Sequence, residues 1–260
     1  DTSDAISAAG GAVHAFTTRH GGVSPAPYDS LNFADNKGDS SENLLENYRR
    51  LGEAVGFDAS RAVGCRQIHS DLVRIASEED AGKILWNDRP YDADGLITNV
   101  PNLPLFAYGT DCCVITLYDP TSRSIGAVHA GWRGTASGIA LKAAVSMMSC
   151  YGADPYTLRA AIGPSIGKCC FETDSDVADA FFALLDPAMD ERIEKRGDKY
   201  HIDLKAINRL WLLRAGIDPS RIDMHPDCTK CRPERYWSHR AMGDQRGGMA
   251  AMICLTEDAL

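Results

Sequence analysis

The expected fold rests on the stretch Cys113-Val-Ile-Thr-Leu-Tyr-Asp-Pro-Thr-Ser-Arg-Ser-Ile-Gly-Ala-Val-His-Ala-Gly-Trp-Arg-Gly134. Within it, two runs of apolar and β-branched residues, Cys113–Tyr118 and Ser124–Ala130, flank the turn-forming tetrapeptide Asp119-Pro-Thr-Ser122. This pattern predicts a β-hairpin. Such a hairpin would bring Cys112 and His129 to the same end, where the two side chains could meet.

A helix is predicted directly after this hairpin. Ser137–Cys150 is rich in Ala, Leu and Met and ends before Gly152, so we expect a helix that begins near Thr135 or Ser137. His129 and Arg133 would then lie between a strand end and a helix start, where backbone N–H groups can face an anion. A tight turn with a capping histidine and a surface arginine is the alternative.

The rest of the chain mixes helical and strand-like patterns. Capping residues and apolar periodicity predict three further helices, which are Leu44–Val55 after a cap at Asp39–Ser41, Asp174–Leu185 and Leu204–Ala215. The further predicted strands are Ala12–Thr17, Gln67–Ile75, Gly95–Asn99, Leu158–Ile162, Arg221–His225 and Met249–Leu255. Strict βαβ alternation, repeats and linkers are absent from the sequence, so we expect a single-domain, mixed-sheet α/β (α+β) sandwich over residues 1–260.

Composition and charge exclude several classes of protein. The 260 residues are 44% hydrophobic and 24% charged, which excludes collagen-like and largely disordered chains. The net charge of −9 has the wrong sign for gripping a nucleic-acid backbone, although local arginines can still bind a small anion. We therefore expect no nucleic-acid partner. No signal peptide is visible in the given sequence and no apolar run reaches ~18 residues, so we expect no membrane partner either.

Cysteine usage favours free thiols. The chain has 9 cysteines, an odd number that includes the adjacent pairs Cys112–Cys113 and Cys169–Cys170. This pattern is typical of a reducing, cytoplasmic location. Cys228-Thr-Lys-Cys231 is a lone C-x-x-C motif without a second C-x-x-C or a thioredoxin-like context, so neither a structural zinc site nor a redox site is favoured there.

Three residues offer nitrogen and sulfur ligands. They are His69 in Arg66-Gln-Ile-His-Ser70, Cys112 in Gly109-Thr-Asp-Cys-Cys113, and His129. Together they form a set that Zn²⁺ or copper prefers, with one coordination position left for water. Two alternatives stay open: a metal-free hydrolase in which Cys112 attacks and His129 is the base, and a structural role for these residues.

Several motifs extend this pattern over nearly the whole chain. They are Thr18-Arg-His-Gly-Gly-Val-Ser24, Tyr28-Asp-Ser-Leu-Asn32, Glu46-Asn47, Gln67-Ile-His69, Ala93-Asp94, Thr110-Asp-Cys112, His129-Ala-Gly-Trp-Arg-Gly134, Gly163-Pro-Ser-Ile-Gly167, Phe171-Glu172, Cys228-Thr229 and Ser238-His-Arg240. In this order they resemble the laccase-domain family of purine nucleoside phosphorylases, also called polyphenol oxidases.

The resemblance implies a ligand set and an activity. It assigns one Zn²⁺, with copper as a possible alternative, to His69, Cys112 and His129. It implies phosphorolysis of adenosine, inosine and methylthioadenosine, with purine nucleoside and phosphate as the partners. It also implies deamination of adenosine by a zinc-bound water, whose pKa falls towards ~7.

The resemblance also suggests residues that handle protons and substrate. Asp94 or Glu172 would move protons. The proposed substrate-binding residues are Arg19, Asn32, Arg133 and Arg240. One arginine of the family pattern is replaced by Ala241, and a second is lost or displaced to Arg246.

Rival classes of protein remain at this point. A multicopper laccase would need a further copper cluster, and 7 histidines without a clustered pair are too few. A copper-dependent polyphenol oxidase, the metal-free Cys-His hydrolase and a non-catalytic nucleotide-binding module stay as alternatives.

Overall fold

The centre of the fold is a six-stranded mixed sheet. The computed structural model describes residues 1–257, and the strand order of this sheet is β11-β7-β5-β6-β3-β2. Its strands are β2 (Val73–Ile75), β3 (Gly95–Thr98), β5 (Cys113–Asp119), β6 (Ser124–Ala130), β7 (Arg159–Ile162) and β11 (Ile222–Met224). The predicted hairpin is confirmed, because β5 and β6 pair antiparallel with Val114 opposite His129.

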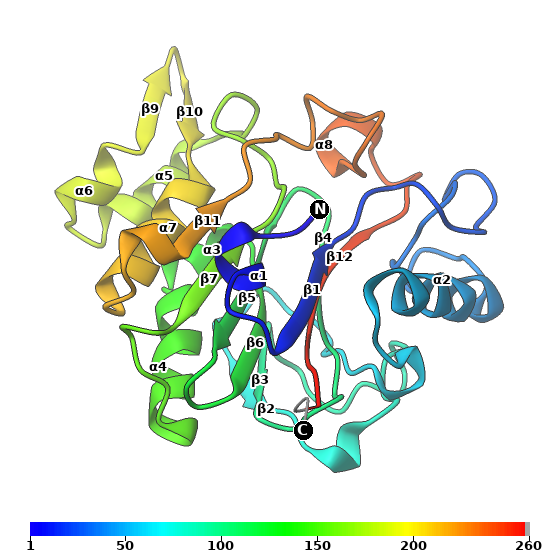
Figure 1. The fold of residues 1–260 in the computed structure, drawn as a ribbon. Coiled ribbons are helices and arrows are strands. Elements are labelled where there is room, and N and C mark those ends of the chain that lie inside the picture. Colours follow the sequence, from blue (N-terminus) through cyan, green and yellow to red (C-terminus); the bar gives the residue numbers. More distant parts are fainter. Residues whose placement is uncertain (258–260) are drawn as a thin grey trace.

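A three-stranded sheet packs against one face of the central sheet. Its antiparallel strands, in the order β1-β12-β4, are β1 (Ala12–Phe16), β12 (Met249–Leu255) and β4 (Leu105–Gly109). Leu105 and Ile253 of this sheet share a buried core with Leu96 and Val114 of the central sheet. Figure 1 shows the two sheets face to face.

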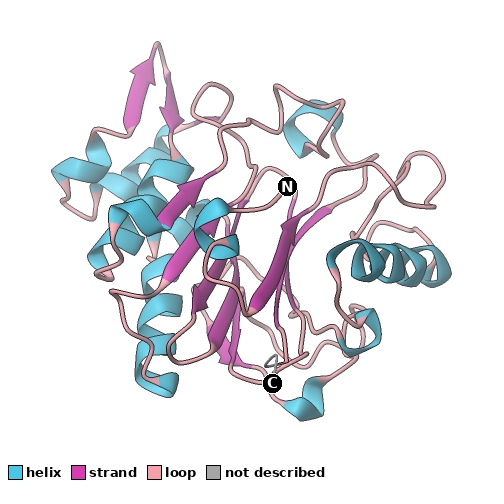
Figure 2. Cartoon of the chain, in the orientation of Figure 1, coloured by secondary structure: helices cyan, strands magenta, loops and turns pink. Residues whose placement is uncertain are grey.

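Helices cover the two outer faces of this sheet pair. On the central sheet, α4 (Ile139–Tyr151) and α7 (Leu204–Arg214) bury an apolar core. On the three-stranded sheet, α2 (Ser41–Val55) packs Tyr48 against Phe106. The layers therefore run helix, sheet, sheet, helix (Figures 1 and 2), which confirms the expected mixed α/β sandwich.

Shorter elements complete the described part of the chain. A third sheet, in the order β8-β10-β9, extends from the helical side of the central sheet, and Ile202 of β10 belongs to the core beneath α4 and α7; β9 and β10 are labelled in Figure 1. The remaining strands and α-helices are α1 (Asp4–Ser7), α3 (Trp132–Ala136), β8 (Glu172–Thr173), α5 (Ser175–Phe182), α6 (Pro187–Asp190), β9 (Ile193–Arg196), β10 (Lys199–Ile202) and α8 (His239–Met242). None of the helices within residues 1–257 has the length and apolar character needed to cross a bilayer.

The predicted helix boundaries follow from capping. The Ser40 side chain accepts the backbone N–H of Asn43 at the start of α2, and Gly56 ends that helix with φ 91°. The helix after the hairpin begins earlier than predicted, because α3 starts at Trp132. Gly138, with φ 74°, then separates α3 from α4.

The predicted strand Gln67–Ile75 is wrong over its first six residues, since only Val73–Ile75 forms β2. The carboxylate of Asp94 accepts the backbone N–H groups of Ile68, His69 and Ser70. His69 has φ 59°, a left-handed conformation that no strand accommodates. This segment is therefore a loop wrapped around a buried carboxylate.

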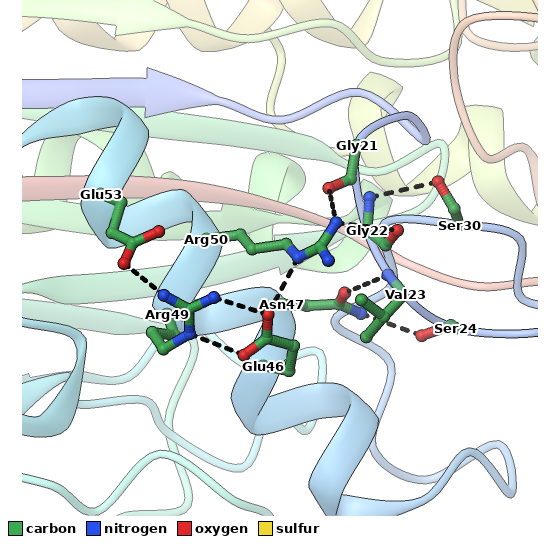
Figure 3. A network of polar contacts seen from close by, with 10 residues as sticks. All are labelled: Gly21, Gly22, Val23, Ser24, Ser30, Glu46, Asn47, Arg49, Arg50 and Glu53. Carbon is green, nitrogen blue, oxygen red and sulfur yellow. Dashed lines mark hydrogen bonds and ion pairs between the residues drawn. The ribbon is translucent and has the colours of Figure 1, made fainter.

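The loop that precedes α2 is anchored by one buried amide. Asn47 of α2 is fully buried, and its Nδ2 donates to Ser24 Oγ at 2.9 Å and to the Asn32 carbonyl at 3.0 Å. Its Oδ1 accepts the Val23 N–H at 2.9 Å. Figure 3 shows this anchor beside the exposed Arg49–Glu53 ion pair.

We expect Asn47→Ala to lower the free energy of unfolding by about 1–3 kcal/mol, since it leaves buried donors and acceptors unpaired. Glu53→Ala on the same helix is the matched control and should change it by less than about 0.5 kcal/mol. Urea denaturation of both variants measures the difference. Equal losses in the two variants would show that Asn47 is no anchor.

Candidate metal centre

The structure brings His69, Cys112 and His129 together. One ligand atom from each lies within 4.8 Å of the other two. Cys112 directly precedes β5, His129 lies in β6, and His69 projects from the loop before β2. The two imidazole rings are 5.0 Å apart and nearly perpendicular. Gly131 leaves room beside them: a Cβ there would lie 3.4 Å from the Cys112 sulfur and 3.1 Å from the His69 ring, which is closer than most such contacts.

Asp94 holds both histidines. Its carboxylate is buried, accepts His129 Nδ1 at 2.8 Å and accepts the His69 backbone N–H at 3.1 Å. It also accepts the N–H and the hydroxyl of Ser70, at 2.6 and 2.7 Å. A histidine held through Nδ1 presents Nε2 to a metal, which is the usual arrangement around histidine ligands. Asp94 therefore positions the cluster, and its oxygen atoms are already engaged.

The charges of the cluster are mutually dependent. Burial opposes ionisation of Cys112, but hydrogen bonds from His129 and His69 outweigh it and lower the thiol pKa to about 6. Burial also disfavours a charged His129, but Asp94 and Cys112 outweigh it and raise the imidazole pKa to about 9. A thiol with a lowered pKa is suited to bind a metal or to act as a nucleophile.

Asp111 fixes the position of Cys112. It has φ 80°, and its carboxylate accepts the Thr229 hydroxyl at 2.6 Å and the Arg240 backbone N–H at 2.7 Å. Its carbonyl accepts the N–H of Ile166 at 2.8 Å. Four of the motifs found in the sequence thus meet at one residue, directly before the candidate ligand.

A cavity of about 210 Å³ opens on this cluster. The residues that line it include the three candidate ligands and the aromatic residues Trp86 and Tyr108, together with Phe33, whose ring is buried against Tyr48. Arg246 also lines it, and the Nε atom of this arginine is buried without a hydrogen-bond partner among the described residues. Aromatic faces beside a guanidinium suit a flat heterocycle and an anion.

The arginines proposed from the sequence lie elsewhere. Within residues 1–257, the lining of this cavity includes neither Arg19, Arg133 nor Arg240. Arg19 donates to the Pro233 carbonyl at 2.9 Å and lies 4.0 Å over the Trp237 ring. Arg240 donates to the Glu172 carbonyl at 2.9 Å. Arg133 is exposed over Trp132, in a separate hollow that shares only His69 with the cavity.

Other proposed residues have structural surroundings. The Glu172 side chain is 53% exposed and lies 3.4 Å from His201. Asn32 is fully buried, and its Oδ1 accepts the N–H groups of Ala34 and Gly248, which line the cavity. Trp237, near Arg240 in the sequence, is 1% exposed and belongs to the core, so its ring does not face the cavity.

A family model described as multi-copper polyphenol oxidoreductase laccase matches residues 13–256 of the chain. This chain belongs to that laccase-like family. It is 35% identical to purine nucleoside phosphorylase YlmD of Geobacillus stearothermophilus, over 95% of this chain and 92% of that protein. It is 34% identical to adenosine deaminase RL5 of an unknown prokaryotic organism, over 90% and 91%. The crystal structure of Geobacillus YlmD matches with a TM-score of 0.90, over 95% and 93% of the two chains.

Sequence reasoning missed part of the cavity of this laccase-like chain. Gln67 Nε2 donates to the Tyr108 carbonyl at 2.8 Å, and its Oε1 accepts the Tyr108 N–H at 2.6 Å, so it ties the His69 loop to β4. Trp86 gave no signal, because it lies in an irregular segment. The sequence indicated Arg246 only as the position to which an arginine of the family pattern is displaced.

Proposed function

We propose that this protein is a zinc-dependent purine nucleoside phosphorylase. It would cleave inosine, adenosine and methylthioadenosine with phosphate, and it would also deaminate adenosine. The observation that carries the proposal is the opening of the His69–Cys112–His129 cluster into a cavity with aromatic rings and an arginine. The names of the relatives from Geobacillus and from the unknown prokaryote support the two reactions.

The three residues fit a metal ion. Two imidazoles and one thiolate converge within 4.8 Å, and a carboxylate on His129 Nδ1 leaves Nε2 free to bind. Such a set binds Zn²⁺ with one position left open, and it also suits copper, so metal analysis must decide. A bound Zn²⁺ would supply the Lewis acid that activates water for deamination.

The cavity suggests how substrates would bind. Trp86 and Tyr108 would pack against the purine ring. Arg246 would bind phosphate, because it lines the cavity beside the candidate metal ligands and a guanidinium donates charged hydrogen bonds to an anion. Water would be largely displaced from such a pocket, which strengthens the arginine–phosphate contact.

A carboxylate in the same cavity would supply a proton to the departing purine. Asp35 is the one carboxylate among the described lining residues. Burial raises its pKa despite the ion pair with Arg89 at 2.6 Å. A raised carboxyl pKa is what a general acid needs near neutral pH. We therefore assign this role to Asp35 in preference to Asp94 and Glu172.

A metal-free hydrolase is the second candidate. Asp94, His129 and Cys112 form a chain of contacts in which the carboxylate orients the imidazole and the imidazole meets the thiol. This is the arrangement of a nucleophilic cysteine, its base and an orienting group. In that mechanism His69 would only help to lower the pKa of the Cys112 thiol. A folded His69→Ala variant that loses both its bound metal and its activity therefore favours the metal, whereas activity that is independent of metal content favours the hydrolase.

Arg246→Ala should raise the KM for phosphate in inosine phosphorolysis by about 10–100-fold, because a charged hydrogen bond contributes about 1.5–3 kcal/mol. Adenosine deamination should change little, since its nucleophile is water. Arg133→Ala tests the phosphate role that the sequence suggested for Arg133, and Arg49→Ala, at an exposed position of α2, is the control. Phosphate titrations measure the KM for phosphate in all three variants. If the KM for phosphate rises in Arg133→Ala but not in Arg246→Ala, the phosphate site lies at Arg133, as the sequence suggested.

A further inference from the structure

A second cluster of four cysteines lies apart from the site just described. It consists of Cys169, Cys170, Cys228 and Cys231, whose sulfur atoms all lie within 4.8 Å of one another. The first two follow the Gly163–Gly167 motif, and the last two are the C-x-x-C motif. We propose that these four thiolates bind one structural Zn²⁺ that joins the two loops.

The sulfur positions match a tetrahedral ion. A zinc ion with Zn–S bonds of ~2.3 Å holds its sulfur atoms about 3.8 Å apart. The Cys231 sulfur lies 3.7 Å from that of Cys169 and 3.5 Å from that of Cys170. Disulfide-bonded sulfur atoms would be ~2.05 Å apart, so this spacing fits a metal.

The backbone of both loops is arranged for ligation. Cys169 and Cys170 lie in a turn, where the N–H groups of Cys170 and Phe171 both donate to the Gly167 carbonyl at 2.9 Å. Neighbouring side chains need not face opposite ways in a turn, in contrast to a strand. Both thiols can therefore reach one ion.

Gly167 brings the two loops into contact. Its N–H donates to the Cys228 sulfur at 3.2 Å, a contact that stabilises a thiolate. A Cβ on Gly167 would lie 3.3 Å from the Cys169 sulfur and 3.2 Å from Cys228 Cβ. Glycine thus leaves the two loops close together, where a side chain would make tight contacts with both cysteines.

The local charge and accessibility suit the ion. Four thiolates around Zn²⁺ carry a net charge of −2. Lys168 and Lys230 adjoin the ligands in the sequence, and Lys168 also lies 3.4 Å from Glu194. Cys169 and Cys231 are exposed, which gives a metal ion access, whereas Cys228 is buried. Sulfur ligands select Zn²⁺ over the hard cations.

The position of the cluster explains what the ion would stabilise. Ser165 forms a backbone bridge with Cys228, and the Thr229 N–H donates to the Ser165 carbonyl at 3.1 Å. Thr229 also holds Asp111, the residue before Cys112. The zinc would therefore brace the loops that position the active-site cysteine, without touching substrate.

Metal content of four proteins tests the proposal, with zinc supplied during expression and no chelator during purification. The wild type should carry two zinc ions per chain, and Cys169→Ser/Cys231→Ser should carry one. Cys112→Ala should also carry one, because the four-cysteine site stays intact. The control Cys150→Ser removes an exposed thiol outside both clusters and should keep two. A double variant that retains both zinc ions overturns the proposal.

Thiol labelling of the wild type covers the case of an unstable double variant. With zinc bound, the four cysteines should resist alkylation, and removal of zinc by a chelator should expose them together, as peptide mapping shows. Cys150 should be labelled in both states. Free labelling of Cys169 and Cys231 in zinc-loaded protein contradicts the proposal. A mass lower by two hydrogens, from a disulfide within the cluster, contradicts it as well.

Discussion

Cys112→Ala should lose the active-site metal and more than about 100-fold of inosine turnover, because even hydrogen-bond partners of metal ligands contribute 10–100-fold. Cys113→Ala should keep both. The Cys113 side chain is fully buried on the opposite side of the strand start, 3.3 Å from the Ser165 hydroxyl, and lies outside the three-residue cluster. Loss of the Cys113 thiol should affect packing alone and lower the free energy of unfolding by about 1–2 kcal/mol.

The measurement combines metal content, inosine turnover and a thermal melt for both variants. Cys112→Ser is the conservative control; it keeps the size but not the soft ligand, so its activity should resemble that of Cys112→Ala. Loss of metal from Cys113→Ala with retention in Cys112→Ala would mean that the two cysteines exchange roles.

Asp94→Asn should weaken metal binding by about 10–100-fold and destabilise the fold by about 2–4 kcal/mol. The amide keeps the shape of the carboxylate, but its NH₂ group would oppose the N–H donors that now converge on Asp94. Metal competition with a chelator and urea denaturation measure the two effects.

Asp92→Asn is the matched control for this substitution. Asp92 lies two residues away, and its side chain is 60% exposed and paired with Arg66. An exposed ion pair contributes little to stability, so Asp92→Asn should change the free energy of unfolding by less than about 1 kcal/mol. Its metal affinity should be unchanged. If Asp94→Asn behaves like Asp92→Asn, the carboxylate does not position the histidines.

Local patterns in the sequence predicted the fold well where short-range interactions decide it. The β5–β6 hairpin follows from its turn residues, and α2 and α7 follow from their caps. The loop around His69 could not be predicted in this way. Its course depends on Asp94, some 25 residues away, and the local alternation of Gln67–Ile75 is typical of a strand.

The candidate metal residues were accessible to sequence reasoning because residue type restricts metal ligands strongly. The arginine that we propose for phosphate was not, because arginines are common on surfaces and only the position in the cavity distinguishes Arg246 from Arg19. The four-cysteine cluster could not be predicted from the C-x-x-C motif alone. The partners of this motif, Cys169 and Cys170, are about 60 residues earlier in the chain, and only the tertiary fold brings the two pairs together.

Incubation of the zinc-loaded wild type with inosine, with and without phosphate, tests the central claim most directly. The products are separated and identified by chromatography. We expect hypoxanthine and ribose 1-phosphate when phosphate is present, and no cleavage when it is absent. Release of hypoxanthine with free ribose in the absence of phosphate, or turnover that persists after complete removal of the metal, would contradict a metal-dependent phosphorylase.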